Sequence, residues 1–510
     1  MIVSFDDQGA ADVNEREPES KARTDRDQEQ ATRTYLIGVC GSAMGGMAGM
    51  LRARGQVVGG SDTQFYEPMV GKLKDWGVQT YTGWEASNID AFAPDQVIVG
   101  NVVRRDNPEM ARVLELGLPY DSFPSYLETH FLRETENIVI TGTHGKTTCS
   151  ALIAWLLEAA GEAPSWFIGG IPENLGRNFS EGTGRWFVLE GDEYDTAFFD
   201  KGPKFLHYRP THGLILNVEL DHVDIYESFE AVKAAFASFS ALVDARGSLT
   251  VCASEPAALA CSEASAAHRV LYGPGEGAQV VPEDLVYERD ETVFTIRTPE
   301  GRRGPFRTQL SGYHNVLNAC GAYGLWRELA ARHEQHEPHE PHQNMDNNPF
   351  SDAAFANGLA SFQGVKKRLD HKGELNGALL FEDFGHHPTA IRAVLGGLRQ
   401  RYPERRVVTA FRAESNTSRT PLFEDQYVEA FTGTDRLLLA ATLTKRDYLK
   451  TARYFDPVQI AATLRERGVE ATAHAEVSDL AETLRRELGP NDLFILFSSR
   501  GMDGLFDLLR

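Results

Sequence analysis

The chain has 510 residues, 42% of them hydrophobic, and a formal net charge of −22 at pH 7. This length exceeds what one hydrophobic core usually organises and predicts about three domains. The negative charge repels polyanions, so we expect no nucleic-acid partner, although a local cationic pocket could still bind a nucleotide. The sequence has neither an apolar signal segment nor the roughly 18 consecutive apolar residues of a membrane helix, so we expect a cytoplasmic protein. Whether it has a protein partner is not indicated by the sequence.

The N-terminal segment and the cysteines give two further indications. Residues 1–33 are rich in Asp, Glu, Arg and Gln, which predicts a disordered tail. The cysteines are odd in number and lack Cys-x-x-Cys spacing, which favours reduced thiols. They are Cys40, Cys149, Cys252, Cys261 and Cys320.

The first predicted domain, residues 34–132, opens with a pattern typical of nucleotide-binding α/β units. An apolar strand from Tyr35 runs into glycines spaced Gly-x-x-Gly-x-x-x-Gly, then a helix to about Arg54 and a strand at 56–59 that leads to Asp62. Such glycines let a diphosphate approach a helix N-terminus. Because the spacing is not Gly-x-Gly-x-x-Gly, the motif alone also allows a nicotinamide-dependent dehydrogenase. The alternation continues with a strand at 96–100, a helix from Asn107-Pro108 and a strand or turn at 118–120.

The second predicted domain, residues 133–365, begins with a phosphate-binding loop. An apolar strand at 138–141 runs into Gly142-Thr-His-Gly145-Lys146-Thr147, followed by a helix over 149–160. The glycines let backbone N–H groups turn toward an anion, the helix N-terminus adds positive potential, and Lys146 supplies a cation. Thr147 offers a hydroxyl to Mg²⁺. A complete Walker A motif would have glycine at Ile140, so a glycine-rich turn beside a surface lysine is the alternative interpretation.

Acidic residues follow two later strands of the same domain. The strand at 186–190 ends in Glu190, and the strand at 213–217 leads to His222. Because parallel strands deliver their carboxyl ends to one sheet edge, Lys146, Thr147, Glu190 and His222 should meet there. Carboxylate and hydroxyl oxygens suit Mg²⁺, and a neutral imidazole can complete a second site. Taken singly, Glu190 could also be a solvated residue at a strand end, and His222 could be a histidine in a surface loop.

Five motifs in this order resemble the Mur ligase family, over about residues 35–510. They lie at residues 142–148, 190–195, 217–222, 312–318 and 383–389. The resemblance implies an α/β fold of three domains. The N-terminal domain, 34–132, would be Rossmann-like and bind a UDP-sugar; the central domain, 133–365, would be P-loop ATPase-like. The C-terminal domain, 366–510, would be Rossmann-like and bind the peptide. The residue pattern of this domain itself predicts strands at 378–382, 407–411, 436–440 and 493–497.

The resemblance also implies an activity, which is ATP-dependent amide formation through an acyl phosphate. The Phe-Phe-Asp-Lys segment at 198–201 is similar to the peptide-transferring branch of the family. That branch joins UDP-N-acetylmuramate to L-alanyl-γ-D-glutamyl-meso-diaminopimelate in peptidoglycan recycling. The alternative within the family is the ligase that adds L-alanine. Outside it, a dehydrogenase leaves Lys146 and Glu190 unexplained, and a nucleotide-binding module without turnover would not need them.

The resemblance further implies individual roles. Lys146 would bridge β- and γ-phosphate oxygens, Thr147 and Glu190 would hold one Mg²⁺, and His222 with Glu190 a second, while His386 would face the reaction centre. The carbamylated lysine of some relatives falls near Phe236, so that group is absent here. The residues implied to bind ATP are Gly142, Thr143, His144, Gly145, Lys146, Thr147, Thr148, His314, Asn315, Asn318, Arg368 and Asp383, and those implied to bind the UDP-sugar are Gly41, Ser42, Met44, Gly45 and Asp62.

Three segments depart from the expected pattern. Residues 412–417 read Arg-Ala-Glu-Ser-Asn-Thr where peptide-transferring relatives tend to have Glu-Pro-Arg-Ser-Asn/Ala-Thr. Arg500 stands in a turn expected to be rich in Ser, Asn and Gly, where it would pair with a substrate carboxylate or face solvent. Residues 333–349 contain closely spaced histidines, which could bind Zn²⁺ or Ni²⁺ weakly, but their Pro and polar content predicts a disordered insertion without a catalytic role.

The phosphate loop gives the first testable prediction. Lys146→Ala should strongly reduce phosphoryl transfer, because the charge that neutralises the phosphates is lost. Phosphate release with Mg²⁺-ATP and circular dichroism of the variant measure activity and folding separately. Near-normal turnover in a folded variant would remove Lys146 from the mechanism.

Overall fold

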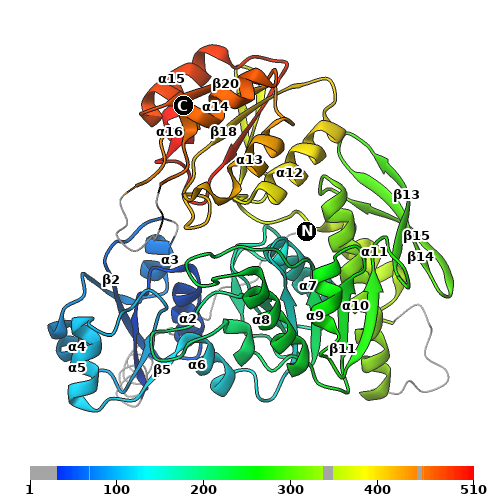
Figure 1. Cartoon of the computed structure of the whole chain (residues 1–510). Coiled ribbons are helices and arrows are strands. Elements are labelled where there is room, and N and C mark those ends of the chain that lie inside the picture. The colour runs from blue at the N-terminus through cyan, green and yellow to red at the C-terminus, as the bar shows by residue number, and fades with distance from the viewer. Residues whose placement is uncertain (1–30, 68, 337–347, 445–450, 452) are drawn as a thin grey trace, which may run out of the picture. The chain divides into compact units, whose positions relative to one another are not determined.

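The computed structural model describes residues 31–67, 69–336, 348–444, 451 and 453–510. The chain separates into two compact units, one ending at Asp121 and the other running from Ser122 to Arg510. Figure 1 shows their helices and strands. No helix in these ranges is both long and apolar enough to cross a membrane.

The N-terminal unit is built on a five-stranded sheet in the order β3-β2-β1-β4-β5, in which β1 pairs in parallel with β2 and β4, and β2 with β3. The strand β1 begins at Arg33, whose N–H donates to Asp95 Oδ2 at 2.7 Å, so the predicted tail extends one residue too far. Residues 1–30 of that tail lie outside the described residues. The elements are β1 (Arg33–Ile37), α2 (Ser42–Ala53), β2 (Val57–Asp62), α3 (Met69–Asp75), β3 (Gln79–Thr82), α4 (Ala86–Phe92), β4 (Gln96–Val99), α5 (Pro108–Leu116) and β5 (Tyr120–Ser122).

The second unit begins with a seven-stranded sheet in the order β12-β11-β10-β6-β9-β7-β8. Its strands are β6 (Glu136–Thr141), β7 (Ser165–Phe167), β8 (Phe179–Ser180), β9 (Trp186–Gly191), β10 (His212–Ile215), β11 (Ser248–Cys252) and β12 (His268–Tyr272). The central strand β6 is rich in β-branched residues and pairs in parallel with both β9 and β10. Its register places Ile140 opposite Glu190 and Thr141 opposite Ile215. The segments that follow the three strands therefore leave the sheet at the same edge, as the sequence predicted.

Helices and a small sheet complete this part of the unit. They are α6 (Phe123–His130), α7 (Lys146–Ala159), η1 (Lys204–His207), α8 (Phe229–Leu242), α9 (Pro256–Ser262), α10 (Tyr313–His336), α11 (Asp352–Ser361), β13 (Val281–Tyr287), β14 (Thr292–Thr298) and β15 (Gly301–Thr308). Helix α7 begins three residues before the predicted helix, directly after the phosphate-loop glycines. The antiparallel sheet β13-β14-β15 was not predicted, although the alternating buried residues of β14 are a period-two signal.

The C-terminal part holds a six-stranded sheet in the order β16-β17-β21-β18-β19-β20. The four predicted strands are confirmed as β17 (Ala378–Asp383), β18 (Arg406–Phe411), β19 (Arg436–Ala440) and β21 (Asp492–Phe497), and the others are β16 (Asp370–Leu375) and β20 (Glu470–His474). All pair in parallel except β16 with β17. The helices are α12 (Pro388–Arg401), η3 (Pro421–Phe423), α13 (Glu424–Phe431), α14 (Pro457–Glu466), α15 (Val477–Glu487) and α16 (Leu505–Leu509). The α/β fold class is thus confirmed.

The predicted insertion at 333–349 is wrong at its N-terminal end. Helix α10 continues to His336, and His333 is 6% exposed, with its ring 5.2 Å from that of Phe350 and Nδ1 3.2 Å from Arg185 Nη2. At the other end, Asn348 Oδ1 accepts the N–H of Phe350 at 2.9 Å. The N-terminal end of the segment is therefore packed, and its C-terminal end is joined by a hydrogen bond to the chain that follows. Residues 337–347 lie outside the described residues.

Replacing residues 337–347 with a short Gly-Ser linker should leave phosphate release with Mg²⁺-ATP unchanged. The helix α10 has 24 residues, so its end lies about 36 Å from its beginning, and the candidate site contacts only the beginning. We expect the free energy of unfolding to change by less than about 1 kcal/mol, measured by urea denaturation beside steady-state kinetics. A matched deletion that starts at His333 removes the buried ring and should destabilise the protein. Loss of activity in the first variant with unchanged stability would contradict this prediction.

Candidate active site

The phosphate loop connects β6 to α7 in a conformation that requires glycine at two positions. Gly142 has φ 143° and Gly145 has φ 84°, and a Cβ on Gly142 would lie 3.0 Å from the Leu216 Cβ. Asn217 holds the loop, since its carbonyl accepts the N–H of Thr143 at 3.0 Å and its Oδ1 accepts that of His144 at 2.7 Å. The helix α7 begins without a side-chain cap, so its positive end remains suited to an anion.

Lys146 forms a buried ion pair with Glu193. Its Nζ lies 2.9 Å from Glu193 Oε1 and 2.8 Å from Oε2, and it also donates to the Gly142 carbonyl at 2.6 Å. Glu193 is 2% exposed. Burial opposes charge on both groups, but their mutual attraction raises the pKa of Lys146 and lowers that of Glu193. The sequence analysis assigned Glu193 no role, and the signal for it was the acidic run Glu-Gly-Asp-Glu at 190–193.

Glu190 and Thr147 contact each other as predicted. The Thr147 hydroxyl donates to Glu190 Oε1 at 2.9 Å, and the Gly169 N–H donates to Glu190 Oε2 at 2.7 Å. Arg368 Nη2 donates to Thr147 Oγ1 at 3.2 Å. Burial raises the pKa of Glu190 despite the nearby positive charges of Lys146 and Arg368. Burial thus disfavours the charged form of Glu190 more than the neighbouring positive charges favour it. A carboxylate in this situation, beside a hydroxyl, fits a hard cation such as Mg²⁺, which would supply further positive charge.

His222 lies close to the same carboxylates. Its ring Nε2 is 3.4 Å from Glu193 Oε1, and its backbone N–H donates to Asp221 Oδ1 at 2.7 Å. Although burial disfavours the imidazolium, the negative charges of Asp221 and Glu193 raise the pKa of His222 to about 9. The potential at this position thus favours positive charge, which either a proton on His222 or a metal ion could supply.

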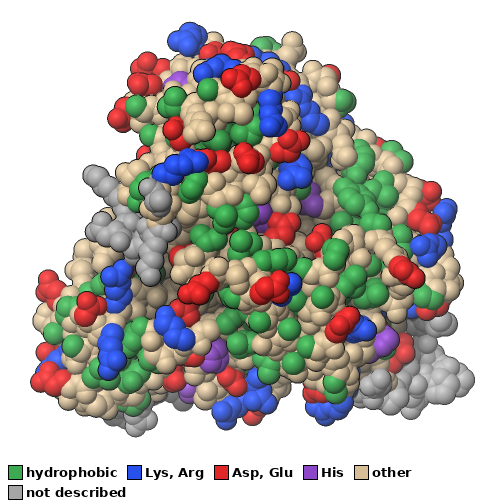
Figure 2. Space-filling view, viewed as in Figure 1, with side chains coloured by type: hydrophobic (Ala, Val, Ile, Leu, Met, Phe, Trp, Pro, Cys, Tyr) green, Lys and Arg blue, Asp and Glu red, His purple; other side chains and the backbone are tan. Residues whose placement is uncertain are grey.

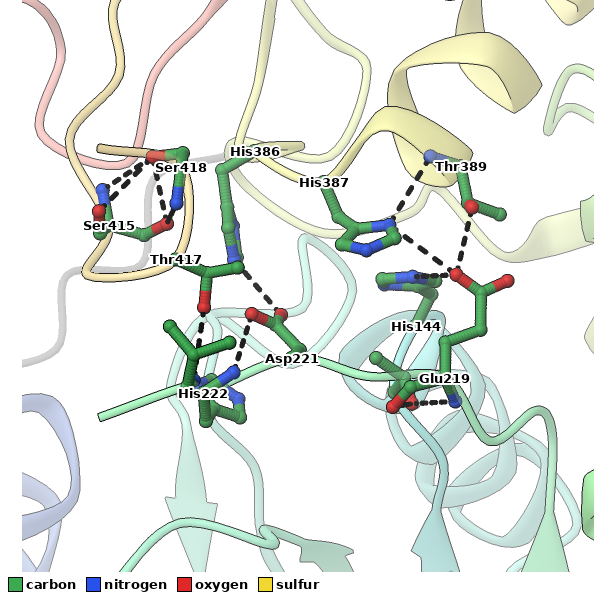
Figure 3. A network of polar contacts seen from close by, with 12 residues as sticks. His144, Glu219, Asp221, His222, His386, His387, Thr389, Ser415, Thr417 and Ser418 are labelled. Atoms are coloured by element: carbon green, nitrogen blue, oxygen red, sulfur yellow. Dashed lines mark hydrogen bonds and ion pairs between the residues drawn. The ribbon is translucent and has the colours of Figure 1, made fainter. Parts of the chain in front are cut away.

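Loops of the C-terminal part contact the segment that follows β10 (Figure 3). His386 Nε2 lies 3.4 Å from Asp221 Oδ2, and Thr389 donates its hydroxyl to Glu219 Oε2 at 2.8 Å. Farther along, Asn416 Nδ2 donates to Asp224 Oδ2 at 2.7 Å. The structure therefore brings His386 to the same side of the phosphate loop as His222.

The residues implied to hold adenine share the start of α10. Asn318 Nδ2 donates to Asn315 Oδ1 at 3.1 Å, and Asn318 Oδ1 lies 3.2 Å from where a Gly145 Cβ would stand. Burial lowers the pKa of His314 to about 4, which keeps its ring neutral. Asp383 accepts the N–H groups of Leu369 and Gly385 at 2.7 and 2.6 Å, so its carboxylate shapes its own loop.

These side chains line one cavity of about 800 Å³. Its wall contains the phosphate loop from Thr143 to Thr148, the start of α10, and residues of the C-terminal part. Figure 2 shows histidine and acidic side chains at a hollow between the parts that carry the six-stranded and seven-stranded sheets. The predicted site residues it brings together are Thr143, His144, Gly145, Lys146, Thr147, Thr148, Glu190, His222, His314, Asn315, Asn318, Arg368, Asp383 and His386.

The residues implied to bind a UDP-sugar lie in the N-terminal unit, around the start of α2. Asp62 Oδ2 accepts the Cys40 N–H at 3.0 Å, which holds the glycine turn. Gly41 precedes α2, and Ser42 is exposed. Met44 is 6% exposed, and a Cβ on Gly45 would lie 2.2 Å from Met69 Sδ. Gly45 therefore allows close packing between α2 and α3.

The departures at 412–417 and 500 have a structural explanation. Arg412 is buried and pairs with Glu414 Oε1 at 2.8 Å and with Asp503. Glu414 Oε2 accepts the N–H groups of Ser499 and Arg500 at 2.9 and 3.0 Å. Relative to the family pattern, an arginine and a glutamate have exchanged places in this segment. Here Arg412 and Glu414 pair with each other, and Glu414 fixes the turn at 499–500. The side chain of Arg500 is exposed. Phe236, at the position implied for a carbamylated lysine, packs its ring 5.6 Å from that of Phe205.

Comparison with known proteins gives matches along the chain. The Mur ligase family catalytic domain matches residues 33–135, the Mur ligase middle domain 140–326, and the Mur ligase glutamate ligase domain 367–500. The UDP-N-acetylmuramate–L-alanyl-γ-D-glutamyl-meso-2,6-diaminoheptandioate ligase of Escherichia coli K12 is 32% identical over 94% of this chain and 97% of its own length. A UDP-N-acetylmuramate–L-alanine ligase of Xanthomonas campestris pv. campestris B100 is 29% identical over 92% of each. The crystal structure of a murein peptide ligase from Psychrobacter arcticus 273-4 matches with a TM-score of 0.69 and 26% identity, over 94% of this chain and 98% of that one.

Glu193→Gln should reduce activity by at least about 10²-fold, since Lys146 loses the carboxylate that positions it. It should also destabilise the fold by about 3–5 kcal/mol, because one partner of a buried ion pair is lost. Phosphate release and urea denaturation measure the two effects.

Two matched variants separate these effects. Lys146→Met combined with Glu193→Gln removes both charges at similar volume, so stability should recover while activity stays low. Asp195→Asn removes an acid from a pair whose lysine, Lys201, is 67% exposed, and should change little. Activity of Glu193→Gln within about twofold of the parent would be inconsistent with a positioning role.

Proposed function

Because the chain belongs to the Mur ligase family, we propose that it is an ATP-dependent ligase that joins UDP-N-acetylmuramate to L-alanyl-γ-D-glutamyl-meso-diaminopimelate in peptidoglycan recycling. The observation that carries this proposal is the single cavity in which Lys146, Thr147, Glu190 and His222 meet Arg368 and His386. A dehydrogenase would not need that arrangement. In this proposal residues 34–132 bind the UDP-sugar, residues 133–365 bind ATP, and residues 366–510 bind the peptide.

ATP fits the cavity by the chemistry of its lining. The loop from Gly142 to Thr148 would hold the phosphates, with Lys146 neutralising their charge. His314, Asn315 and Asn318 would contact adenine, and Arg368 a phosphate. The carboxylate of Asp383 would support the ribose contact by fixing its loop.

Mg²⁺ fits the oxygen-rich donor set at the end of β9. Thr147 and Glu190 would hold one ion, and Glu190 with His222 a second, and bound Mg²⁺ would neutralise phosphate charge. The desolvated carboxylate of Glu190 and the negative potential at His222 support this assignment.

The reaction that we propose is the one implied by the family, with roles assigned to these residues. The muramate carboxylate attacks the γ-phosphorus of ATP, ADP leaves, and an acyl phosphate forms; Lys146 and Arg368 balance the charge that moves between the oxygens. The amine of the peptide then attacks the acyl carbon, and phosphate leaves with the bonding electrons. We assign His386, oriented by Asp221, to accept the amine proton.

The choice of a tripeptide over L-alanine rests on two observations. The segment at 198–201 resembles the peptide-transferring branch, and the Escherichia coli relative with that activity in its name covers nearly the whole chain. In the structure Asp200 Oδ2 accepts the Ser122 hydroxyl at 2.6 Å and lies 3.1 Å from His207 Nε2. This segment therefore forms a fixed feature of the second unit.

The test offers the tripeptide and L-alanine in parallel, with Mg²⁺-ATP and UDP-N-acetylmuramate, and identifies products by mass. We expect phosphate release and a UDP-muramoyl-tripeptide with the tripeptide, and little product with L-alanine. The Lys146→Ala variant serves as the inactive control. Preference for L-alanine would assign the chain to the other branch, and absence of product from both would contradict the proposal.

A further inference from the structure

Three side chains outside the proposed Mg²⁺ positions converge on one point (Figure 3). His144 comes from the phosphate loop, Glu219 from the segment after β10, and His387 from the residue that precedes α12. One ligand atom from each lies within 4.8 Å of the other two. His144 Nε2 and His387 Nδ1 are each 3.4 Å from the same oxygen, Glu219 Oε2.

These distances suit a shared ion better than two direct hydrogen bonds. An N–H group that donates to a carboxylate usually lies about 2.7–2.9 Å from the oxygen. In a tetrahedral zinc site with bonds of about 2.0–2.1 Å, adjacent ligand atoms lie about 3.3–3.4 Å apart. Both nitrogen–oxygen separations equal that edge. The two rings are close but tilted, with a centroid distance of 4.6 Å and an interplanar angle of 37°.

The surroundings hold the ligands in place. Thr389 donates its hydroxyl to Glu219 Oε2 at 2.8 Å. Its N–H makes a longer contact of 3.3 Å to His387 Nδ1, which a metal ion bound to that nitrogen would replace. The Thr143 hydroxyl accepts the Glu219 N–H at 2.8 Å. His387 is 5% exposed, and its Nε2 has no hydrogen-bond partner among the described residues. The contacts to Glu219 are of the kind that orient a carboxylate ligand at a metal site.

We propose that His144, Glu219 and His387 form a binding site for a borderline transition-metal ion of the Zn²⁺ class, with a fourth position left open. Two imidazoles and one carboxylate select Zn²⁺ over Mg²⁺, which takes oxygen ligands in octahedral geometry. The site is distinct from the positions at Thr147, Glu190 and His222. A bound ion would connect the phosphate loop to the start of α12 and so restrain the C-terminal part against the loop.

Cobalt spectroscopy tests this site without nucleotide or substrate, so the result is independent of the proposed ligase activity. The protein is the full chain without a histidine tag, carrying His336→Gln, His339→Gln and His342→Gln to remove competing ligands. We expect one equivalent of Co²⁺ to give the intense visible absorption of tetrahedral geometry, and Zn²⁺ to displace it. Thr389→Val should weaken binding by about 10–100-fold, because it loses the hydroxyl that orients Glu219.

Four further variants decide the location. His387→Ala and Glu219→Gln should each abolish the signal, with circular dichroism to verify folding. His222→Ala, and His268→Ala with its 62% exposed side chain, should retain it. The proposal is overturned if the tetrahedral signal is absent from the parent, persists in folded Glu219→Gln, or disappears with His222→Ala.

Discussion

The buried pair of Lys146 and Glu193 is the constraint on which the rest of the site depends. Three adjacent parallel strands release their following segments at one edge, so several carboxylates gather where the phosphate loop begins. In a buried site such charges interact strongly and must be compensated. Lys146 compensates Glu193, while Glu190 retains more desolvation than its neighbours offset. The sheet edge that brings together the residues proposed to bind phosphate therefore also brings together carboxylates, whose negative charge must be balanced by cations.

The contact with the C-terminal part has a different character. Asp221, Glu219 and Asp224 reach its loops through hydrogen bonds and long ion pairs. Asp221 is 4% exposed, so its ion pair with His386 is shielded from water, whereas the hydrogen bond between Asn416 and Asp224 is exposed and individually weak. A metal ion at His387 would add a further link between the same two parts.

The departures at Arg412 and Glu414 show how a substitution can preserve an interaction. The carboxylate of Glu414 accepts hydrogen bonds from the turn at 499–500, and Arg412 pairs with Glu414 and Asp503. Both charges are thus used within the protein, and the exposed Arg500 is left on the turn that they fix. An altered motif therefore does not by itself indicate an altered ligand.

The sequence by itself determined the α/β alternation of the main sheets, the glycine-dependent phosphate loop and the shared sheet edge of Thr147 and Glu190, because β-branched runs, glycine and strand-end acids are local signals. Only the tertiary structure decided the partners of Lys146, the buried place of His333 and the meeting of Glu219 with His387. Those depend on which distant segments pack together and on how burial shifts the balance between charges. Glu193 illustrates both contributions. The acidic run at 190–193 predicted that a carboxylate lies near the phosphate loop, but only the fold showed that Glu193 is the one that pairs with Lys146.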